Sequence, residues 1–336
     1  SNNTNHLVIR NNKGPATALY IDDQAVKPSP GNGEVLVQVK AFGLNRMDIA
    51  QREGRYPVPP QAGPVLGVEF SGIVDELGDG CDPETCKIGD EVFGLVYGGA
   101  YAEYVRVSQR MVIPKPAEWS WEFAAAIPET WMTATQTLHE VAKIQPGNSI
   151  LWHAGASAVS IAGIQMSVAA GASAVYATVG TDEKVVFTQS IGAAESFNYR
   201  TQDWSSGIKA ATGHRGVDII VDFVGKDYLG KNLNTVAKDG RIVVLALMSG
   251  SVVSESVDIA PILRKRATIS GSNLRGRDLD YQVKIKEELV NWVIPRMRKG
   301  EFQVPIESVF SFTEVVEAHQ LMESNATKGK IICTIG

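Results

Sequence analysis

The chain has 336 residues, of which 44% are hydrophobic and 21% charged. This length exceeds one ordinary hydrophobic core and suits two domains. Its 32 basic and 37 acidic side chains give a net charge of −5 and are mixed along the chain, which argues against nucleic acid as a main partner. No apolar run reaches the ~20 residues that a membrane-spanning helix needs, so no membrane partner is expected. The polar start without an apolar leader favours a soluble, cytoplasmic protein.

Three cysteines occur, Cys81, Cys86 and Cys333. This odd and small number argues against a disulfide framework. The first two lie in a turn-rich loop, residues 78–90, but a tetrahedral zinc site needs four ligands, and no second pair of cysteines or histidines lies nearby in the sequence. We therefore expect free thiols and no metal in this loop.

Short β-rich runs alternate with glycine and proline in the first third of the chain. The runs cover residues 34–45, 67–78, 89–96 and 100–107. Their spacing and punctuation predict a compact, mostly antiparallel domain that resembles a barrel.

From about residue 124 the pattern changes to apolar runs that alternate with helical segments. The apolar runs cover residues 149–153, 174–179, 217–224, 240–247 and 267–272, and a long helical segment at 278–300 follows the last of them. Alternation of this kind predicts a doubly wound, parallel sheet in an α/β domain.

The last stretch returns to strands, with one helix at residues 312–324. It ends in an apolar strand, residues 328–336, which we expect to rejoin the first domain. The sequence thus predicts a nucleotide-binding domain at 124–300, inserted into a discontinuous β domain formed by residues 1–123 and 301–336.

Residues 149–172 read as a strand, a loop of small residues and an amphipathic helix, which is the context that a dinucleotide fingerprint requires. The glycines of such a loop make the turn, admit the pyrophosphate and let the helix pack on the strand. Here only Gly155 remains in the loop. Alanine and serine at the following positions still leave amide groups at a helix N-terminus, where an anion is favoured. By itself the loop is compatible with a cofactor site or with a bare packing turn.

The end of the next strand, residues 174–179, bears on the choice between NAD and NADP. An NAD site places an acidic residue at the end of this strand, whereas the chain continues here with Gly180 and Thr181. Lys184 follows in the next helix, and Tyr199 comes after the next short strand. Together, a hydroxyl, an ammonium and a phenol suit a 2′-phosphate, although helix capping, exposure to solvent and packing would explain each residue singly.

At this point the chain resembles the medium-chain dehydrogenase/reductase superfamily. Within it, the chain is similar to the zinc-free, zeta-crystallin-like quinone oxidoreductases, and most of all to their tumour-suppressor-inducible branch. The resemblance covers nearly the whole chain and is carried by residues 43–60, 125–157, 177–184, 197–200, 247–250, 272–278 and 323–331. It implies a GroES-like β-barrel domain joined to a Rossmann domain, NADPH as the cofactor, and a homodimer.

The resemblance also implies site residues, position by position. On the cofactor side these are Thr133 near the nicotinamide; Ala156, Ser157, Ala158 and Val159 along the pyrophosphate; Gly180, Thr181, Lys184 and Tyr199 at the 2′-phosphate; Phe223 and Val224 at the adenine; and Leu247, Met248, Asn273 and Leu274 near the nicotinamide. On the substrate side they are Asn45, Arg46 and Tyr56, as donors that stabilise an oxyanion and supply a proton. The chain departs from the family where Ala158, Ser160 and Ala246 replace glycines; the first two changes would lower cofactor affinity, and the third would narrow the nicotinamide pocket.

Zinc-dependent relatives carry a cysteine early in the barrel domain and a histidine beside a glutamate. Here the matching stretches read GLNRMD and GVEFSG, with neither ligand, and we expect the remaining Glu69 to accept hydrogen bonds from backbone or arginine. Without a Lewis acid the substrate must already be electrophilic, as a quinone or an α,β-unsaturated carbonyl is. The sequence therefore predicts an NADPH-dependent oxidoreductase that reduces such small molecules.

Two alternatives stay open. One is a biosynthetic double-bond reductase with one dedicated substrate, and the other is a non-catalytic relative with a degenerate cofactor loop. Asn45 suits a helix cap as well as an active site, and Asp48 is expected to be structural.

Overall fold

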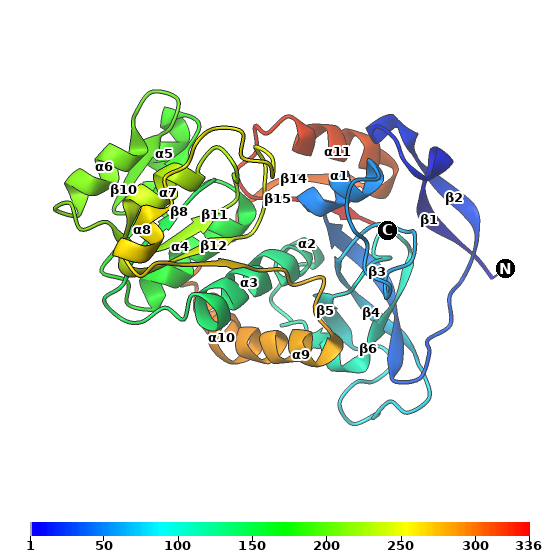
Figure 1. Cartoon of the computed structure of the whole chain (residues 1–336). Coiled ribbons are helices and arrows are strands. Elements are labelled where there is room, and N and C mark those ends of the chain that lie inside the picture. The colour runs from blue at the N-terminus through cyan, green and yellow to red at the C-terminus, as the bar shows by residue number, and fades with distance from the viewer. Residues whose placement is uncertain (1) are drawn as a thin grey trace. The chain divides into compact units, whose positions relative to one another are not determined.

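The structure, a computed structural model, describes residues 2–336, which form two compact units (Figure 1). The first unit contains the residues up to Met132, Arg275–Val290 and Val304–Gly336, and the second contains Thr133–Leu274 and Asn291–Gln303. This division differs from the expected boundaries at 123/124 and 300/301, and it assigns residues 275–290 to the first unit. Ion pairing explains that assignment, because Asp280 pairs with Arg110 at 2.7 Å and Lys286 Nζ donates to the Arg110 carbonyl at 2.6 Å.

The first unit is built on an extended β-sheet. Its strands are β1 (Asn3–Ile9), β2 (Leu19–Val26), β3 (Glu34–Gly43), β4 (Glu69–Leu77), β5 (Glu91–Leu95), β6 (Tyr104–Ser108), β7 (Val112–Pro114), β14 (Ile306–Ser311) and β15 (Lys330–Thr334). The main sheet has the order β14-β15-β3-β4-β5-β7, with β6 on β3, while β1 and β2 form a separate pair. All pairs are antiparallel except β14 with β15. The final strand therefore rejoins the first domain, as expected.

Four helices accompany this sheet: α1 (Arg46–Arg52), α2 (Trp121–Ala125), α9 (Leu279–Glu288) and α11 (Val315–Glu323). A small-residue contact lets α2 approach the sheet closely, because Ala125 and Ala126 pack on Ala41 of β3 and Ile332 of β15, all fully buried. Helix α1 follows β3 after two residues, and its start carries two of the three residues predicted for the substrate side, Asn45 as the N-cap and Arg46 as the first helical residue.

The second unit holds a six-stranded parallel sheet of the order β10-β9-β8-β11-β12-β13. The strands are β8 (Ser149–Trp152), β9 (Ala174–Val179), β10 (Glu195–Asn198), β11 (Val217–Asp222), β12 (Val236–Val244) and β13 (Thr268–Gly271), and the helices are α4 (Ala158–Ala169), α5 (Asp182–Ser190), α6 (Trp204–Ala211), α7 (Leu229–Thr235), α8 (Ala260–Arg264) and α10 (Ile294–Arg298). Counted along the chain, this order is 3-2-1-4-5-6, which is the Rossmann arrangement. The predicted fold class is confirmed.

One core cluster of the second unit lies among β8 to β12 and helices α6 and α7. Its members are Leu151, Tyr176, Phe197, Trp204, Ile208, Val217, Ile220, Leu233, Val236 and Ile242. In such a sheet, ligands bind outside the carboxyl ends of the strands, where the strand order reverses between β8 and β11. Most predicted cofactor residues follow the carboxyl ends of β8 to β12, so this topology brings them to one edge.

Two helical runs are interrupted by π-helical turns, at Gln136–Val141 after α3 (Pro128–Thr135) and at Leu289–Val293 between α9 and α10. The long helix expected at 278–300 is therefore two helices joined by such a turn, with Pro295 in the first turn of α10. Within residues 2–336, no helix combines the length and the apolar character needed to cross a membrane.

Candidate active site

The loop between β8 and α4 is drawn tightly against β9. The Gly155 amide donates to the Thr178 carbonyl at 2.9 Å, and a Cβ at residue 155 would lie 2.9 Å from the Cβ of Ala177. Only glycine allows this approach. The preceding Ala154 has φ +48°, in the left-handed region that costs a non-glycine residue of order 1–2 kcal/mol. The retained glycine thus serves packing, and the sharp turn is made at an alanine.

Both serines of this loop are engaged at the start of α4. The Ser157 hydroxyl caps the helix by accepting from the Ser160 amide at 3.4 Å. Ser160 is fully buried, and its hydroxyl donates to the His153 carbonyl at 2.9 Å. The amides of Ala158 and Val159 lie in the first helical turn, where no intrahelical acceptor exists, and so suit pyrophosphate oxygens. The serine that replaces a family glycine is therefore bonded to the end of β8.

His153 is buried directly after β8 and connects this strand to its neighbours by hydrogen bonds. Its Nδ1 lies 2.7 Å from Thr178 Oγ1 on β9, and its Nε2 lies 2.8 Å from Asn232 Oδ1 on α7. The ring packs edge-on against Trp204, with 4.6 Å between centroids. Burial lowers the pKa of His153 to about 4, so the ring is neutral at physiological pH. It holds the strand ends together and carries no charge toward the loop.

The residues predicted for the 2′-phosphate follow β9 and β10, where Gly180 and Tyr199 approach one another. Thr181 caps α5 by accepting from the Lys184 amide at 3.2 Å, which places Lys184 in the first helical turn. A Cβ at Gly180 would lie 2.8 Å from the Tyr199 hydroxyl, so the phenol reaches across the end of β9. Tyr199 is 43% exposed and can meet a ligand.

Arg200 lies beside Gly180 and Tyr199 and was not among the predicted site residues. Its Nε would lie 3.5 Å from a Cβ at Gly180, and its guanidinium lies 5.9 Å from the centre of the Tyr199 ring. The signal was present in the sequence as the residue after Tyr199. It adds a second cation to Lys184, and the planar guanidinium suits bidentate binding of phosphate.

The loops that follow β11 and β12 are hydrogen-bonded to one another. The Met248 amide donates to the Phe223 carbonyl at 3.0 Å, and the Ser249 amide donates to the Val224 carbonyl at 2.7 Å. The Asp222 carboxylate shapes the first loop by accepting from the Val224 amide at 3.1 Å. The structure therefore brings Phe223, Val224, Leu247 and Met248 together, with the side chains of the last two exposed.

The predicted residues near the nicotinamide are linked through Gln136. Its Nε2 donates to the Asn273 carbonyl at 3.4 Å, and Thr137, one residue further on, donates its hydroxyl to the Thr133 carbonyl at 2.8 Å. Leu274 is buried. This segment of the second unit thus holds Thr133, Asn273 and Leu274 in one neighbourhood.

In the first unit, Asn45 is bound into a buried charge pair. Lys330 Nζ donates to the Leu44 carbonyl and to Asn45 Oδ1, both at 2.9 Å, and to Glu69 Oε1 at 2.5 Å. Asn45 Nδ2 donates to the same Glu69 oxygen at 3.0 Å, and the Glu129 amide donates to the other at 2.8 Å. Glu69 is fully buried and Lys330 is 3% exposed. Both polar atoms of the Asn45 amide group are thus engaged by this charge pair.

The residues present do not fit a catalytic zinc ion. Both oxygens of Glu69 are taken, and the Lys330 ammonium occupies the side of Glu69 that a cation would need. Among residues 2–336, no group of three or more His, Cys, Asp or Glu side chains is arranged to hold a metal ion. The positive charge beside Glu69 is supplied by this chain itself.

The other predicted substrate-side residues, Arg46 and Tyr56, differ in exposure. Arg46 begins α1 and is exposed, whereas Tyr56 is half-buried beneath the guanidinium of Arg275, which lies 5.1 Å from its ring centre. Burial raises the pKa of Tyr56, so its phenol keeps the proton at neutral pH. No hydrogen bond within residues 2–336 joins Tyr56 to Asn45 or Arg46, although Asn45 and Arg46 are adjacent.

Asp48 closes the first turn of α1 and begins a buried chain of hydrogen bonds. Its Oδ2 accepts from the Asn45 amide at 2.8 Å and from the Tyr101 hydroxyl at 3.0 Å. Tyr101 in turn lies 3.0 Å from His319 Nε2, and Arg52 donates to His319 Nδ1 at 2.7 Å. Since arginine only donates, every bond of this chain runs toward the Asp48 carboxylate. Asp48 is thus structural, as expected.

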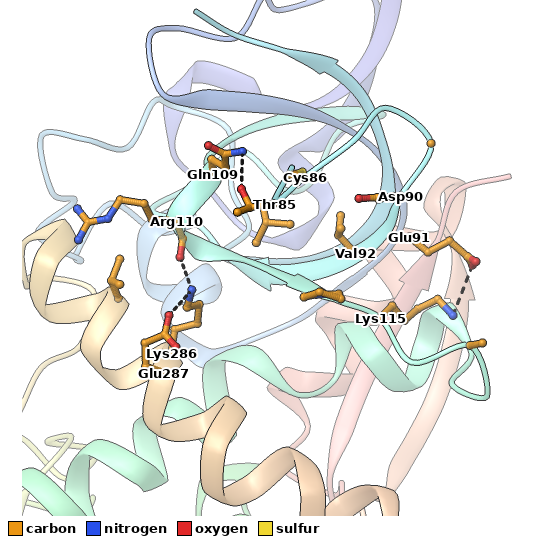
Figure 2. A pocket seen from close by; sticks show the side chains of 15 residues that line it. Thr85, Cys86, Asp90, Glu91, Val92, Gln109, Arg110, Lys115, Lys286 and Glu287 are labelled. Atoms are coloured by element: carbon orange, nitrogen blue, oxygen red, sulfur yellow. Dashed lines mark hydrogen bonds and ion pairs between the residues drawn. The ribbon is translucent and has the colours of Figure 1, made fainter. Parts of the chain in front are cut away.

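Figure 2 shows a groove of about 680 Å³ elsewhere in the first unit, lined by parts of β5, β7 and α9. Most of its charged side chains are paired: Lys115 with Glu91 at 3.5 Å, Lys286 with Glu287 at 2.8 Å, and Arg110 with Asp280 at 2.7 Å. None of the predicted site residues lines it. The groove is therefore separate from the candidate active site.

Comparisons with known proteins agree with the fold. Residues 31–117 match the alcohol dehydrogenase GroES-like domain, and residues 158–292 match the family described as zinc-binding dehydrogenase. Quinone oxidoreductase-like protein 2 of Bos taurus is 30% identical over 317 residues, which are 94% of this chain and 89% of that protein.

Two solved structures are similar over the full length. Escherichia coli quinone oxidoreductase, complexed with NADPH, has a TM-score of 0.87 and 28% identity, covering 99% of this chain and 100% of that one. The CurK enoyl reductase has a TM-score of 0.84 and 25% identity, covering 99% of each chain. The chain therefore belongs to the quinone oxidoreductase family of the medium-chain dehydrogenase/reductase superfamily and is an oxidoreductase of that family.

Proposed function

We propose that the protein is an NADPH-dependent, zinc-free reductase that transfers hydride to a quinone or an α,β-unsaturated carbonyl. The observation that carries this proposal is the position of Lys330. Its ammonium fills the space between Glu69 and Asn45, so these residues are engaged without a metal. A substrate reduced here must accept hydride without a Lewis acid, and conjugated carbonyls do so because the negative charge is delocalised.

NADPH is preferred over NADH in this proposal because of the charges after β9 and β10. Lys184 and Arg200 supply two cations, Tyr199 supplies a hydroxyl, and the strand end carries no acidic residue that would bind a free 2′-hydroxyl. The relative from Escherichia coli was solved with NADPH, which supports the same choice.

The chain's own residues would divide the work as follows. The amides of Ala158 and Val159 hold the pyrophosphate, and the loops with Phe223 and Met248 border the remaining parts of the cofactor. When bound, the nicotinamide supplies a hydride, which leaves an oxyanion on the substrate and requires one proton. The protonated phenol of Tyr56 is suited to supply that proton.

The test is a titration of the purified protein with NADPH and NADH, followed by nicotinamide fluorescence, and then a panel of quinones and enones. We expect NADPH to bind at least tenfold more tightly, about 1.4 kcal/mol, and to be oxidised by members of the panel. Absence of NADPH oxidation with every substrate would refute the proposal. Loss of binding to both nucleotides would instead favour the non-catalytic alternative.

A dedicated double-bond reductase is the second candidate, favoured by the similarity to the CurK enoyl reductase. It predicts negligible activity with general quinones and strong activity with one enone. The same panel separates the two candidates, because a general reductase accepts several unrelated quinones.

The proposed partner is a second copy of this chain, paired through β13. This strand is the edge of the parallel sheet and is largely exposed, with Ile269 at its centre 40% exposed. An exposed edge presents unpaired backbone groups that another strand can meet. Ile269→Pro should convert a dimer to a monomer in light scattering; a wild-type protein that is monomeric at all concentrations would contradict the pairing.

A further inference from the structure

The buried guanidinium of Arg275 has two nitrogens without a hydrogen-bond partner. Arg275 is 4% exposed and directly follows Leu274, which is predicted to lie near the nicotinamide. Its Nε donates to the Tyr97 carbonyl at 2.8 Å, which orients the planar group. Nη1 and Nη2 are buried, and no group within residues 2–336 accepts from either of them. One edge of the guanidinium is anchored, and the other is buried without an acceptor beside Tyr56, whose pKa the charge of Arg275 acts to lower against the larger effect of burial.

A buried guanidinium without an acceptor lowers the stability of the folded protein, because a charge removed from water is normally paired and hydrogen-bonded. A counter-ion is close at hand in Asp48, since the charge of Arg275 acts to lower the pKa of that carboxyl group against the effect of burial. Yet Asp48 Oδ2 is bonded to the Asn45 amide and the Tyr101 hydroxyl, and Oδ1 has no partner. The hydrogen bonds of α1 thus hold the carboxylate in place without pairing it to Arg275.

We propose that Arg275 is a catalytic residue of the reductase, whose Nη1 and Nη2 donate hydrogen bonds to the substrate oxygen that becomes negative. This inference rests on the proposed function. The guanidinium presents two donors in a rigid plane, which suits a developing oxyanion. It also takes over the role that the sequence predicts for Asn45, whose amide is largely engaged by Glu69 and Lys330.

The reaction balances with groups that the proposal names. Hydride from NADPH adds two electrons and one hydrogen to a quinone, or to the β-carbon of an enone. The electron pair displaced from the π system moves to the oxygen held by Arg275, and the nicotinamide is oxidised. A proton from Tyr56 or solvent completes the hydroquinone or the saturated ketone. Tyr56 is placed for this step because its ring packs against the same guanidinium.

The test compares Arg275→Gln with Arg277→Gln in the full-length protein. Arg277 is the matched control, because it is an exposed arginine two residues away that stacks on the Tyr281 ring at 4.0 Å. For Arg275→Gln we expect kcat to fall on the order of 10²-fold, while NADPH affinity stays within about twofold of wild type. Arg277→Gln should keep kcat. In Arg275→Ala, added guanidinium ion should restore at least part of the lost kcat, which a merely structural arginine would not allow.

Several outcomes would overturn the role of Arg275. One is an Arg275→Gln protein that folds, binds NADPH and keeps kcat within about threefold of wild type. Another is a folded Arg275→Ala protein that guanidinium ion fails to rescue. If both variants unfold, Arg275→Lys decides, because it keeps the charge but lacks the two-pronged donor; full activity in that variant would refute the proposal. A wild-type protein without any reductase activity would refute the proposed function itself. Failure of the proposed function is therefore distinguishable from failure of the role of Arg275.

Discussion

The indole ring of Trp152 lies directly over the backbone of Gly163. Trp152 ends β8 and is fully buried, and Gly163 is in the middle of α4. A Cβ at residue 163 would come within 2.2 Å of the indole ring, far inside any permissible contact. The indole Nε1 donates to Ser167 Oγ one turn later, at 3.0 Å. Strand β8 and helix α4 can therefore pack closely because the large indole of Trp152 occupies the space that a side chain at residue 163 would need.

Replacing Gly163 by alanine should therefore destabilise the protein. Overpacking of a tight core costs typically 1–3 kcal/mol, which outweighs the gain of about 1 kcal/mol in helix propensity. Urea unfolding would measure the loss. Gly230→Ala in α7 is the control, because its Cβ would meet no atom closer than 4.0 Å, and it should be neutral or slightly stabilising. Equal stability of Gly163→Ala and wild type would contradict the fit described for Trp152.

Arg200→Ala should weaken NADPH binding about tenfold and leave NADH binding unchanged. The reason is that, in the proposed cofactor site, its guanidinium would meet the 2′-phosphate, which NADH lacks. Fluorescence titration with both nucleotides measures the effect. Arg264→Ala removes the same charge from the exposed last turn of α8 and should alter neither affinity. A similar loss for both nucleotides would show that Arg200 acts elsewhere.

Removing the ammonium of Lys330 should be strongly destabilising. Lys330→Met leaves the fully buried Glu69 without its counter-ion, which costs about 3–5 kcal/mol for a broken buried pair. The double variant Glu69→Gln, Lys330→Met carries no uncompensated charge and should recover part of that loss. Denaturant unfolding of the three proteins gives the comparison. If the double variant were no more stable than Lys330→Met alone, the charge pair would not be the cause.

Asp48 should make stability fall as the pH rises from about 4 to 6. Burial raises the pKa of this carboxyl group to about 6, so the native state holds a proton that the unfolded chain releases near pH 4. The stabilisation is complete below pH 4 and is lost through pH 6, with a total on the order of 2–3 kcal/mol. The difference in unfolding free energy between wild type and Asp48→Asn, measured from pH 4 to 7, gives the contribution of the Asp48 carboxyl group. A difference that is constant over that range would contradict the raised pKa.

Much of the second unit could be predicted from the sequence, because its strands are continuous apolar runs separated by amphipathic helices. This alternation predicts a parallel, doubly wound sheet with right-handed crossovers, but it does not by itself fix the order of the strands. The assignment of residues 275–290 to the first unit could not be predicted in this way. It depends on the pairing of Asp280 with Arg110, which are 170 residues apart.

The candidate site was predicted less completely, because several of its residues are brought together or distinguished only by the folded chain. Lys330 and Glu69 are separated by 261 residues, and hydrophobic periodicity says nothing about such pairs. Arg275 differs from the exposed Arg277 in being buried and in having two nitrogens without a hydrogen-bond partner, and both are properties of the folded chain. Gly163 lies three residues beyond Ser160, inside α4 and outside the loop that the fingerprint covers, and its close contact with Trp152 is a property of the folded chain.

The pairing of β15 with β3 affects the order in which the two units can fold during synthesis. Leu44, just after β3, and Lys330 are 286 residues apart, and the last strand lies between β3 and β14 in the sheet. At a synthesis rate of about 5–20 residues per second, β3 must wait roughly 15–60 s for this neighbour. Most of the nucleotide-binding unit emerges meanwhile, so it can fold first, while the waiting strand exposes an open edge that a chaperone could cover.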